Sequence, residues 1–184
     1  MNRRSKLTVT LAVAGVVLLV IGGSLGYYLW WQGGQAEQAA AELLEQMRET
    51  SDGEDQTDAS VLRIESIGLE LPVLWEYSLE GLKTTVCRYQ GPLPGADGNL
   101  VITGHDYLNG AHFGNLEKVT VGDEIQLFDQ NGGAFIYIVY DLAVIAPDEA
   151  QELDNFQPPH TLTLMTCADN ANSRLLVRCR PKTG

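Results

Sequence analysis

The chain has 184 residues, which is enough for one modest domain with appendages. It contains 24 acidic and 12 basic residues, and its formal net charge is −12. This balance argues against binding to nucleic acid, which requires a basic face. The charge is uneven along the chain, because residues 1–34 contain three basic and no acidic residues, whereas residues 35–60 contain eight acidic residues and one arginine.

Residues 1–31 are expected to form a cytoplasmic tip and a transmembrane signal anchor. The segment 7–31 has 25 residues and no charge, and about 20 apolar residues cross the hydrocarbon core as a helix. Two tyrosines and two tryptophans stand at its end, where aromatic rings favour the membrane interface. Because basic residues precede the segment and acidic residues follow it, the positive-inside rule predicts a single-pass protein with a cytoplasmic N-terminus and an extracellular remainder.

A cleaved signal peptide is the alternative interpretation of this segment. The apolar region of a signal peptide usually has only 7–15 residues and is followed by a small-residue cleavage site. In this chain the apolar run is longer and aromatic residues occupy its end. These features favour an uncleaved anchor.

Residues 32–60 are expected to form an acidic stalk. The segment 35–50 is rich in Ala, Glu, Gln and Leu, which are good helix formers, and its apolar residues recur at helical spacing. The segment 51–58 is acidic and lacks apolar residues, which is typical of a flexible linker. We expect the helix and the linker to hold the next domain off the membrane.

From residue 61 onward the sequence changes to short strand patterns separated by turn-forming residues. The clearest strand candidates are 99–103, 124–128, 134–144 and 161–167, and the second and third are spaced as a hairpin. Seven or eight short strands with few helices predict a mainly β domain, in the form of a closed or nearly closed β-barrel with short helices.

Three chemically useful side chains stand at strand ends. Threonine and leucine alternate in the segment 161–167, which ends at Cys167, and Arg174 opens the strand that follows a short polar loop. His105 comes directly after the apolar run 99–103 and Gly104. A strand end is a rigid position from which a side chain can be aimed into a cleft.

A thiol, an imidazole and a guanidinium suit acyl transfer. A nearby cation stabilises the cysteine thiolate, and histidine can protonate a leaving amine. Arginine keeps its proton and suits hydrogen bonding to a substrate carbonyl or a developing oxyanion. The alternative is that Cys167 is a buried structural thiol, His105 a loop residue and Arg174 a solvated cation. Spacing alone does not decide between the two interpretations.

Several segments resemble the motifs of sortases. The segment 163–167 (TLMTC), followed after a short loop by Arg174, is similar to the TLxTC motif and downstream arginine of that family. The segment 99–105 (NLVITGH) resembles the family's strand ending in Gly-His, and 93–98 (LPGADG) resembles the turn before it. The order of the motifs and the N-terminal anchor also match. The resemblance covers about residues 61–180.

The resemblance implies a closed sortase-type β-barrel in residues 61–184 and a cysteine transpeptidase activity. Cys167 would be the nucleophile, His105 the acid/base and Arg174 the stabiliser of the carbonyl or oxyanion. The expected substrates are proteins with an LPXTG-like sorting signal, and the expected acceptor is an amine of a cell-wall precursor or a pilin lysine. No cofactor is expected. Some sortases bind calcium through acidic loops, but the spacing of the acids in 148–154 assigns no ligands.

Two of these assignments have alternatives within the chain. His112 is a second candidate for the catalytic histidine, but only His105 ends a Gly-His strand. Arg178 is a second candidate for the arginine, but it lies inside the last strand, whereas Arg174 lies at the loop exit. We therefore favour His105 and Arg174.

Cys87 and Cys179 permit one extracellular disulfide that would leave Cys167 free. We favour the alternative, a buried free thiol at each of the two positions.

The subclass stays open between a class-B-like and a class-D-like enzyme. The segment 105–116 resembles the loop after the catalytic histidine of class B sortases. Those enzymes usually have an extra helix between the sixth and seventh strands, and only residues 148–159 are available for it in this chain.

Two other functions fit parts of the pattern. A papain-like peptidase of the cell wall would also use a cysteine and a histidine, but in such enzymes the cysteine precedes the histidine. An anchored β-barrel that only binds a wall polymer or a partner would need none of the three side chains.

Overall fold

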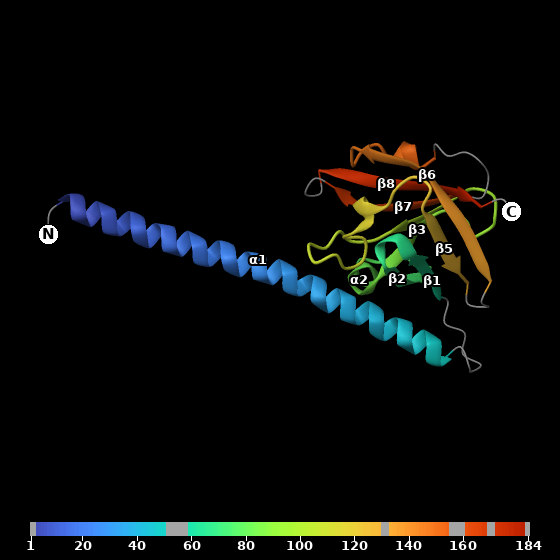
Figure 1. The fold of residues 1–184 in the computed structure, drawn as a ribbon, viewed down its shortest axis with the longest axis horizontal. Coiled ribbons are helices and arrows are strands. Elements are labelled where there is room, and N and C mark those ends of the chain that lie inside the picture. Colours follow the sequence, from blue (N-terminus) through green and yellow to red (C-terminus); the bar gives the residue numbers. More distant parts are fainter. Residues whose placement is uncertain (1–2, 51–58, 130–132, 155–160, 169–171, 183–184) are drawn as a thin grey trace.

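The computed structural model describes residues 3–50, 59–129, 133–154, 161–168 and 172–182. One long helix, α1 (Arg3–Thr50), leads into a β domain that contains the C-terminal part of the chain (Figure 1). Within Thr10–Arg48, α1 is long and apolar enough to cross a membrane, with a mean hydropathy of 2.0. A helix rises 1.5 Å per residue and the hydrocarbon core is about 30 Å thick, so the C-terminal turns of α1 extend beyond a membrane span.

Eight strands are present in the described part of the β domain: β1 (Ala59–Ile64), β2 (Leu69–Leu74), β3 (Val86–Gln90), β4 (Asn99–Thr103), β5 (Glu124–Phe128), β6 (Ala134–Ile145), β7 (Thr161–Ala168) and β8 (Ser173–Pro181). Short helices lie between them: the 3-10 turns η1 (Glu65–Ile67), η2 (Leu116–Lys118) and η3 (Ala150–Leu153), and the helix α2 (Leu79–Thr84). Ser78 caps α2, because its side chain accepts a hydrogen bond from the N–H of Gly81 at 2.9 Å.

The strands close into a barrel in the order β1-β2-β3-β4-β7-β8-β6-β5, and β5 pairs back to β1. Most neighbours are antiparallel, but β4 pairs with β7 in parallel, from Asn99 opposite Thr161 to Thr103 opposite Met165. Parallel neighbours end at the same edge of a sheet. The chain segments that follow β4 and β7 are thereby brought together, although about 60 residues separate them in sequence.

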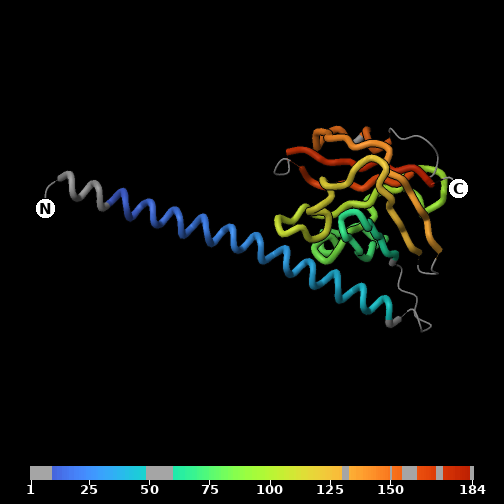
Figure 2. Tube along the Cα trace, in the orientation of Figure 1, coloured from blue at the N-terminus to red at the C-terminus, as the bar shows by residue number. Residues whose placement is uncertain are grey.

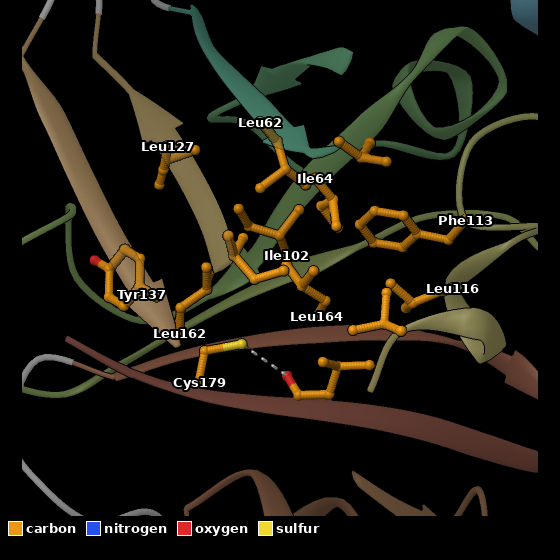
Figure 3. Close-up of a cluster of buried hydrophobic side chains, with 14 of the residues drawn as sticks. Leu62, Ile64, Ile102, Phe113, Leu116, Leu127, Tyr137, Leu162, Leu164 and Cys179 are labelled. Carbon is orange, nitrogen blue, oxygen red and sulfur yellow. Dashed lines mark hydrogen bonds between the residues drawn. The ribbon is translucent and has the colours of Figure 1, made fainter. Parts of the chain in front are cut away.

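The barrel core explains the alternation in β7. Leu162 and Leu164 point into the barrel beside Ile102 of β4 (Figure 3), and burying a leucine side chain contributes roughly 1.5–3 kcal/mol. The threonines on the other face are also buried, because η3 covers that face. Thr161 and Thr163 donate hydrogen bonds to the side-chain carbonyl of Asn99, at 3.1 and 2.9 Å.

Figure 2 shows that α1 passes along the barrel rather than ending before it. α1 contacts β2 and α2, and the side chains of Ala36 and Ala40 are 4% and 2% exposed. We expected the helix to hold the domain off the membrane, but its C-terminal third packs on the domain. Small side chains at positions 33, 36 and 40 lie on one helix face and allow this close approach.

The expected fold is confirmed: a closed, mainly β barrel of eight described strands with short helices, preceded by one long apolar helix. The expected hairpin of residues 124–128 and 134–144 is also present as β5 and β6. The expected flexible linker 51–58 lies outside the described residues.

Candidate active site

Cys167 is the penultimate residue of β7, at the edge of the barrel. The strand is fixed by its buried leucines and by two neighbours, β4 and β8, to which it is hydrogen-bonded. The thiol itself is partly exposed. Cys167 is therefore an accessible thiol on a rigid support.

Arg174 is the residue directly opposite Cys167 in the antiparallel ladder between β7 and β8. Side chains at opposed positions lie on the same face of a sheet, with Cβ atoms about 4.5–5.5 Å apart. One guanidinium N–H of Arg174, at Nη1, donates to the carbonyl of Ser173 at 3.0 Å. The hairpin thus holds a permanent cation beside the thiol.

His105 follows β4, and two hydrogen bonds fix this strand end against β7. The N–H of Gly104 donates to the carbonyl of Met165 at 3.2 Å, and the hydroxyl of Thr166 donates to the carbonyl of Gly104 at 2.9 Å. A Cβ on Gly104 would lie 2.7 Å from a side-chain carbon of Val86. Glycine is required before His105 because the strand end is packed this closely.

One cleft of about 300 Å³ is lined by His105, Cys167 and Arg174 together. Its other walls are mainly apolar or aromatic, from Tyr77, Leu82, Tyr89, Ile145, Leu153 and Met165. Such a lining with a few convergent polar groups is typical of a ligand site. The structure therefore brings all three sequence-predicted site residues to one cleft.

A second cleft, of about 250 Å³, opens on the other side of the same thiol. Cys167 and Thr166 line both clefts, and the second one also contains Asp106 and Glu117. Its two carboxyl groups give this side of Cys167 an acidic character. Burial, and then the neighbouring Glu117, raise the pKa of Asp106 above its ordinary value.

Burial also lowers the pKa of His105 below its usual 6.5, because removal from water disfavours the imidazolium. At neutral pH the imidazole is therefore mainly neutral and able to accept a proton from the thiol. The imidazolium that results can then act as a general acid.

The comparisons with known proteins agree with this geometry. A family model described as the sortase domain matches residues 62–182, which is most of the β domain. The chain belongs to the sortase family. Membership of this family supports transpeptidase activity.

Several sortases are similar to this one. Sortase A of Bacillus anthracis is 24% identical over 182 aligned residues, which cover 85% of this chain and 86% of that protein. The structure of sortase A from Corynebacterium diphtheriae is 28% identical, with a TM-score of 0.63 and coverage of 77% of this chain and 68% of that one. Sortase C1 of Streptococcus agalactiae is 26% identical, with a TM-score of 0.62 and coverage of 82% and 91%.

A sortase D5 transpeptidase of Clostridium perfringens shares the fold, with a TM-score of 0.62 and 22% identity over 80% of this chain and 99% of that one. The named neighbours thus include sortases of classes A, C and D.

His112, the alternative histidine, lies outside both clefts of this sortase. Its side chain is 3% exposed, and its Nε2 lies 3.2 Å from the carbonyl of Thr84 at the end of α2. Since a carbonyl only accepts, Nε2 carries the proton. His112 is therefore a buried residue that packs against α2 and does not line either cleft.

Arg178, the alternative arginine, forms ion pairs at another part of β8. It lies four residues beyond Arg174, about 13 Å along the strand, and its side chain is 12% exposed. Its guanidinium pairs with Asp141 at 2.8 Å and with Glu152 at 3.1 Å. Arg174 is the arginine that lines the cleft with Cys167.

Cys87 and Cys179 are both buried and unpaired, as the favoured sequence interpretation predicted. Burial raises the pKa of both thiols. Both therefore stay protonated, and Cys167 is the one partly exposed thiol of the three.

Two of the acids in the segment 148–154, for which the sequence assigned no calcium ligands, have other partners. The carboxylate of Glu149 accepts a hydrogen bond from the N–H of Ala146 at 2.8 Å, and Glu152 pairs with Arg178. Within the described ranges, no group of three or more potential metal ligands is clustered.

Sequence reasoning did not single out Tyr107 or Thr166. Thr166 fixes the end of β4 through Gly104, and the ring of Tyr107 packs edge-on against the imidazole of His105. Thr166 directly precedes Cys167, and Tyr107 lies two residues after His105. These two positions were the signals by which the sequence could have identified them.

Proposed function

We propose that this sortase is a membrane-anchored cysteine transpeptidase that cleaves an LPXTG-like sorting signal and joins the released carboxyl end to an amine. α1 would anchor it with a cytoplasmic N-terminus and the barrel outside the cell, since basic residues precede the apolar run and acidic residues follow it. The acceptor would be an amine of a cell-wall precursor or a pilin lysine. No cofactor takes part in the proposed reaction.

In the first half-reaction, the Cys167 thiolate attacks the carbonyl carbon of the Thr–Gly bond. Arg174 donates hydrogen bonds to the carbonyl oxygen as it becomes an oxyanion. The imidazolium of His105 gives its proton to the glycine nitrogen, the C–N bond breaks, and a thioester to Cys167 remains.

In the second half-reaction, an acceptor amine attacks the thioester. Neutral His105 takes the proton that the attacking nitrogen loses, a new amide bond forms, and the Cys167 thiolate leaves. The atoms balance without another reactant, because the leaving and attacking groups are both amines.

The two clefts suggest where the two substrates lie. The apolar and aromatic walls beside Arg174 suit the sorting signal, which carries leucine and proline before its threonine. The acidic cleft with Asp106 and Glu117 suits a cationic amine. Since Cys167 lines both, the acceptor could reach the thioester without displacing the acyl chain.

The observation that carries the proposal is the shared cleft. A binding module would have no need for a thiol, an imidazole and a guanidinium at one cleft, and a structural role would not leave the thiol exposed.

The test uses the full chain in detergent micelles with an LPXTG-type peptide and a small amine. We expect Cys167→Ala and His105→Ala each to lower cleavage and transfer by at least about 100-fold. Arg180→Lys, at an exposed position of β8, is the matched control and should retain activity. Full activity of the Cys167→Ala variant would contradict the proposal, and an inactive wild type would favour a binding module.

A further inference from the structure

A row of three rings leads from the active-site cleft to helix α1. The ring of Tyr107 lies between two imidazoles, with its centroid 5.4 Å from that of His105 and 5.1 Å from that of His112. Both contacts are edge-to-face, with interplanar angles of 61° and 75°. Pairs in this geometry attract each other beyond their buried area. The orientation of His105 therefore depends on Tyr107, and that of Tyr107 on His112.

His112 is fixed by its backbone as well as its ring. Its φ of 51° lies in the left-handed region that residues other than glycine rarely adopt. The loop around it is closed by a bridge between Asp106 and His112 and by a hydrogen bond of 3.0 Å from the N–H of Phe113 to the carbonyl of His105. Such strained residues persist only where the surroundings hold them, and they cluster at functional sites.

The ring of His112 lies at the contact between α1 and the barrel. On one side Nε2 donates to the carbonyl of Thr84 in α2, and on another the backbone of Ala36 in α1 faces the ring. Nδ1 is buried and has no hydrogen-bond partner among the described residues. The ring of His112 thus contacts α2 at Thr84 and faces α1 at Ala36.

α1 also presses on the loop that carries these rings. Gly33 packs so closely on the side chain of Asn109 that a Cβ at position 33 would collide with it. One turn further, Ala36 is buried beside His112. Figure 1 shows α1 running past α2 on this side of the barrel, and the two helices are in contact.

We propose that Tyr107 and His112 are positioning residues for His105, and that the packing of α1 on the barrel holds this row of rings in place. The proposal rests on the proposed catalytic role of His105. It makes the anchor helix part of the support of the active site, so that full transfer activity requires α1 to be packed on the barrel.

The expected signature follows from a support that the loop after His105 has and Cys167 lacks. Cys167 and Gly104 are both fixed by the β4–β7–β8 part of the sheet, whereas the loop that begins at His105 also contacts α1 at Gly33 and α2 at Thr84. Loosening the loop would misplace the proton donor and leave the cleft walls intact. A misplacement of about 1 Å can lower a rate by roughly 100-fold. We therefore expect kcat to fall with little change in KM for the sorting peptide.

The first test disturbs the helix contact from a distance, in the full chain in detergent micelles. Ala36→Leu puts a larger side chain into the contact, and Gly33→Ala is a milder change at the neighbouring turn. Gln38→Leu adds the same leucine on the exposed side of α1 and is the matched control. We expect kcat to fall about 10- to 100-fold for Ala36→Leu, less for Gly33→Ala, and not for Gln38→Leu.

The second test removes and then restores the middle ring. Tyr107→Leu should lower kcat by a similar factor, whereas Tyr107→Phe keeps the ring and should restore the wild-type value. NMR of isotope-labelled histidine supplies an independent readout, because the chain has only three histidines. Ala36→Leu should shift the ring signals of His105, although the substitution lies in α1, and Gln38→Leu should not.

The proposal is overturned if Ala36→Leu, Gly33→Ala and Tyr107→Leu melt as the wild type does and keep its kcat and its His105 signals. If Ala36→Leu proves unfolded, the same comparison of kcat and His105 signals is made with Gly33→Ala, Tyr107→Leu and Tyr107→Phe. Failure of the proposed function has a different result, since His105→Ala would then retain turnover.

Discussion

Cys167 and Arg174 are opposed residues of the β7–β8 hairpin, and both line the cleft that His105 closes from β4. The ladder therefore fixes the guanidinium relative to the sulfur, independently of the long loop between β4 and β7. Because the two residues share a hairpin and the histidine comes from elsewhere, substitutions of Arg174 and of the His105 loop should have separable effects.

Arg174→Lys should lower kcat by about 10- to 1,000-fold, because a lysine keeps the charge but loses the planar, two-pronged donor geometry that stabilises an oxyanion. Steady-state kinetics with an LPXTG-type peptide and an amine give the measurement. Arg180→Lys on the exposed part of the same strand is the control. Equal kcat values for Arg174→Lys and the wild type would show that Arg174 does not contact the oxyanion.

The pH dependence of kcat/KM should reflect the lowered pKa of His105. Below the pKa of His105 the imidazole is already protonated and can no longer take the proton of the thiol, so the rate should fall as the pH falls through that pKa. Since burial lowers that pKa, the acid limb should have its midpoint below 6.5. A midpoint above 6.5 would argue against His105 as the acid/base.

Glu117→Gln should weaken binding of the acceptor amine and leave binding of the sorting peptide unchanged. The substitution keeps the size of the side chain and removes a charge from the second cleft. We expect KM for the amine to rise about 1.5- to 5-fold, as for loss of one exposed charge contact, with an unchanged rate of peptide hydrolysis. An unchanged KM for the amine would place the acceptor elsewhere.

The contact of Gly33 with Asn109 predicts that the loop after His105 lies at the membrane surface. Gly33 is two residues beyond Trp31, which is about 3 Å along the helix axis, and the neighbouring Leu108 is 78% exposed. The tryptophan of Leu108→Trp, in a chain whose three native tryptophans (Trp30, Trp31 and Trp75) are replaced by tyrosine, should be quenched by brominated lipids in nanodiscs.

The control for this measurement is Ala134→Trp, at the start of the exposed β5–β6 hairpin, which Figure 1 shows on the side away from the N-terminal half of α1. The tryptophan at position 134 should not be quenched. Equal quenching at the two positions would mean that the loop does not face the bilayer.

The parts of the fold that sequence reasoning found are those with local signals. The alternation in 161–167, the apolar run 99–103 and the hairpin of 124–128 with 134–144 appear as β7, β4 and the β5–β6 pair. The strand β3 was not anticipated, because its five residues include a charged arginine and only two of them pair with β2.

The site residues were found at strand ends, but their convergence is a property of the topology. His105 and Cys167 meet only because β4 and β7 pair in parallel, a contact that no local pattern contains. The family motifs supplied the missing information. The burial of His112 was not anticipated for a similar reason, because it depends on α1 packing on a domain that is distant from it in sequence.

Mass spectrometry of the intact full chain, incubated with a library of sorting-signal peptides and no amine, tests the cysteine mechanism most directly. The predicted result is a covalent adduct on Cys167 whose mass is that of the peptide fragment ending in threonine, less one water. The adduct should be absent from Cys167→Ala and should disappear when an amine is added. Cleaved peptide without an adduct on Cys167, or an adduct on another residue, would contradict the mechanism.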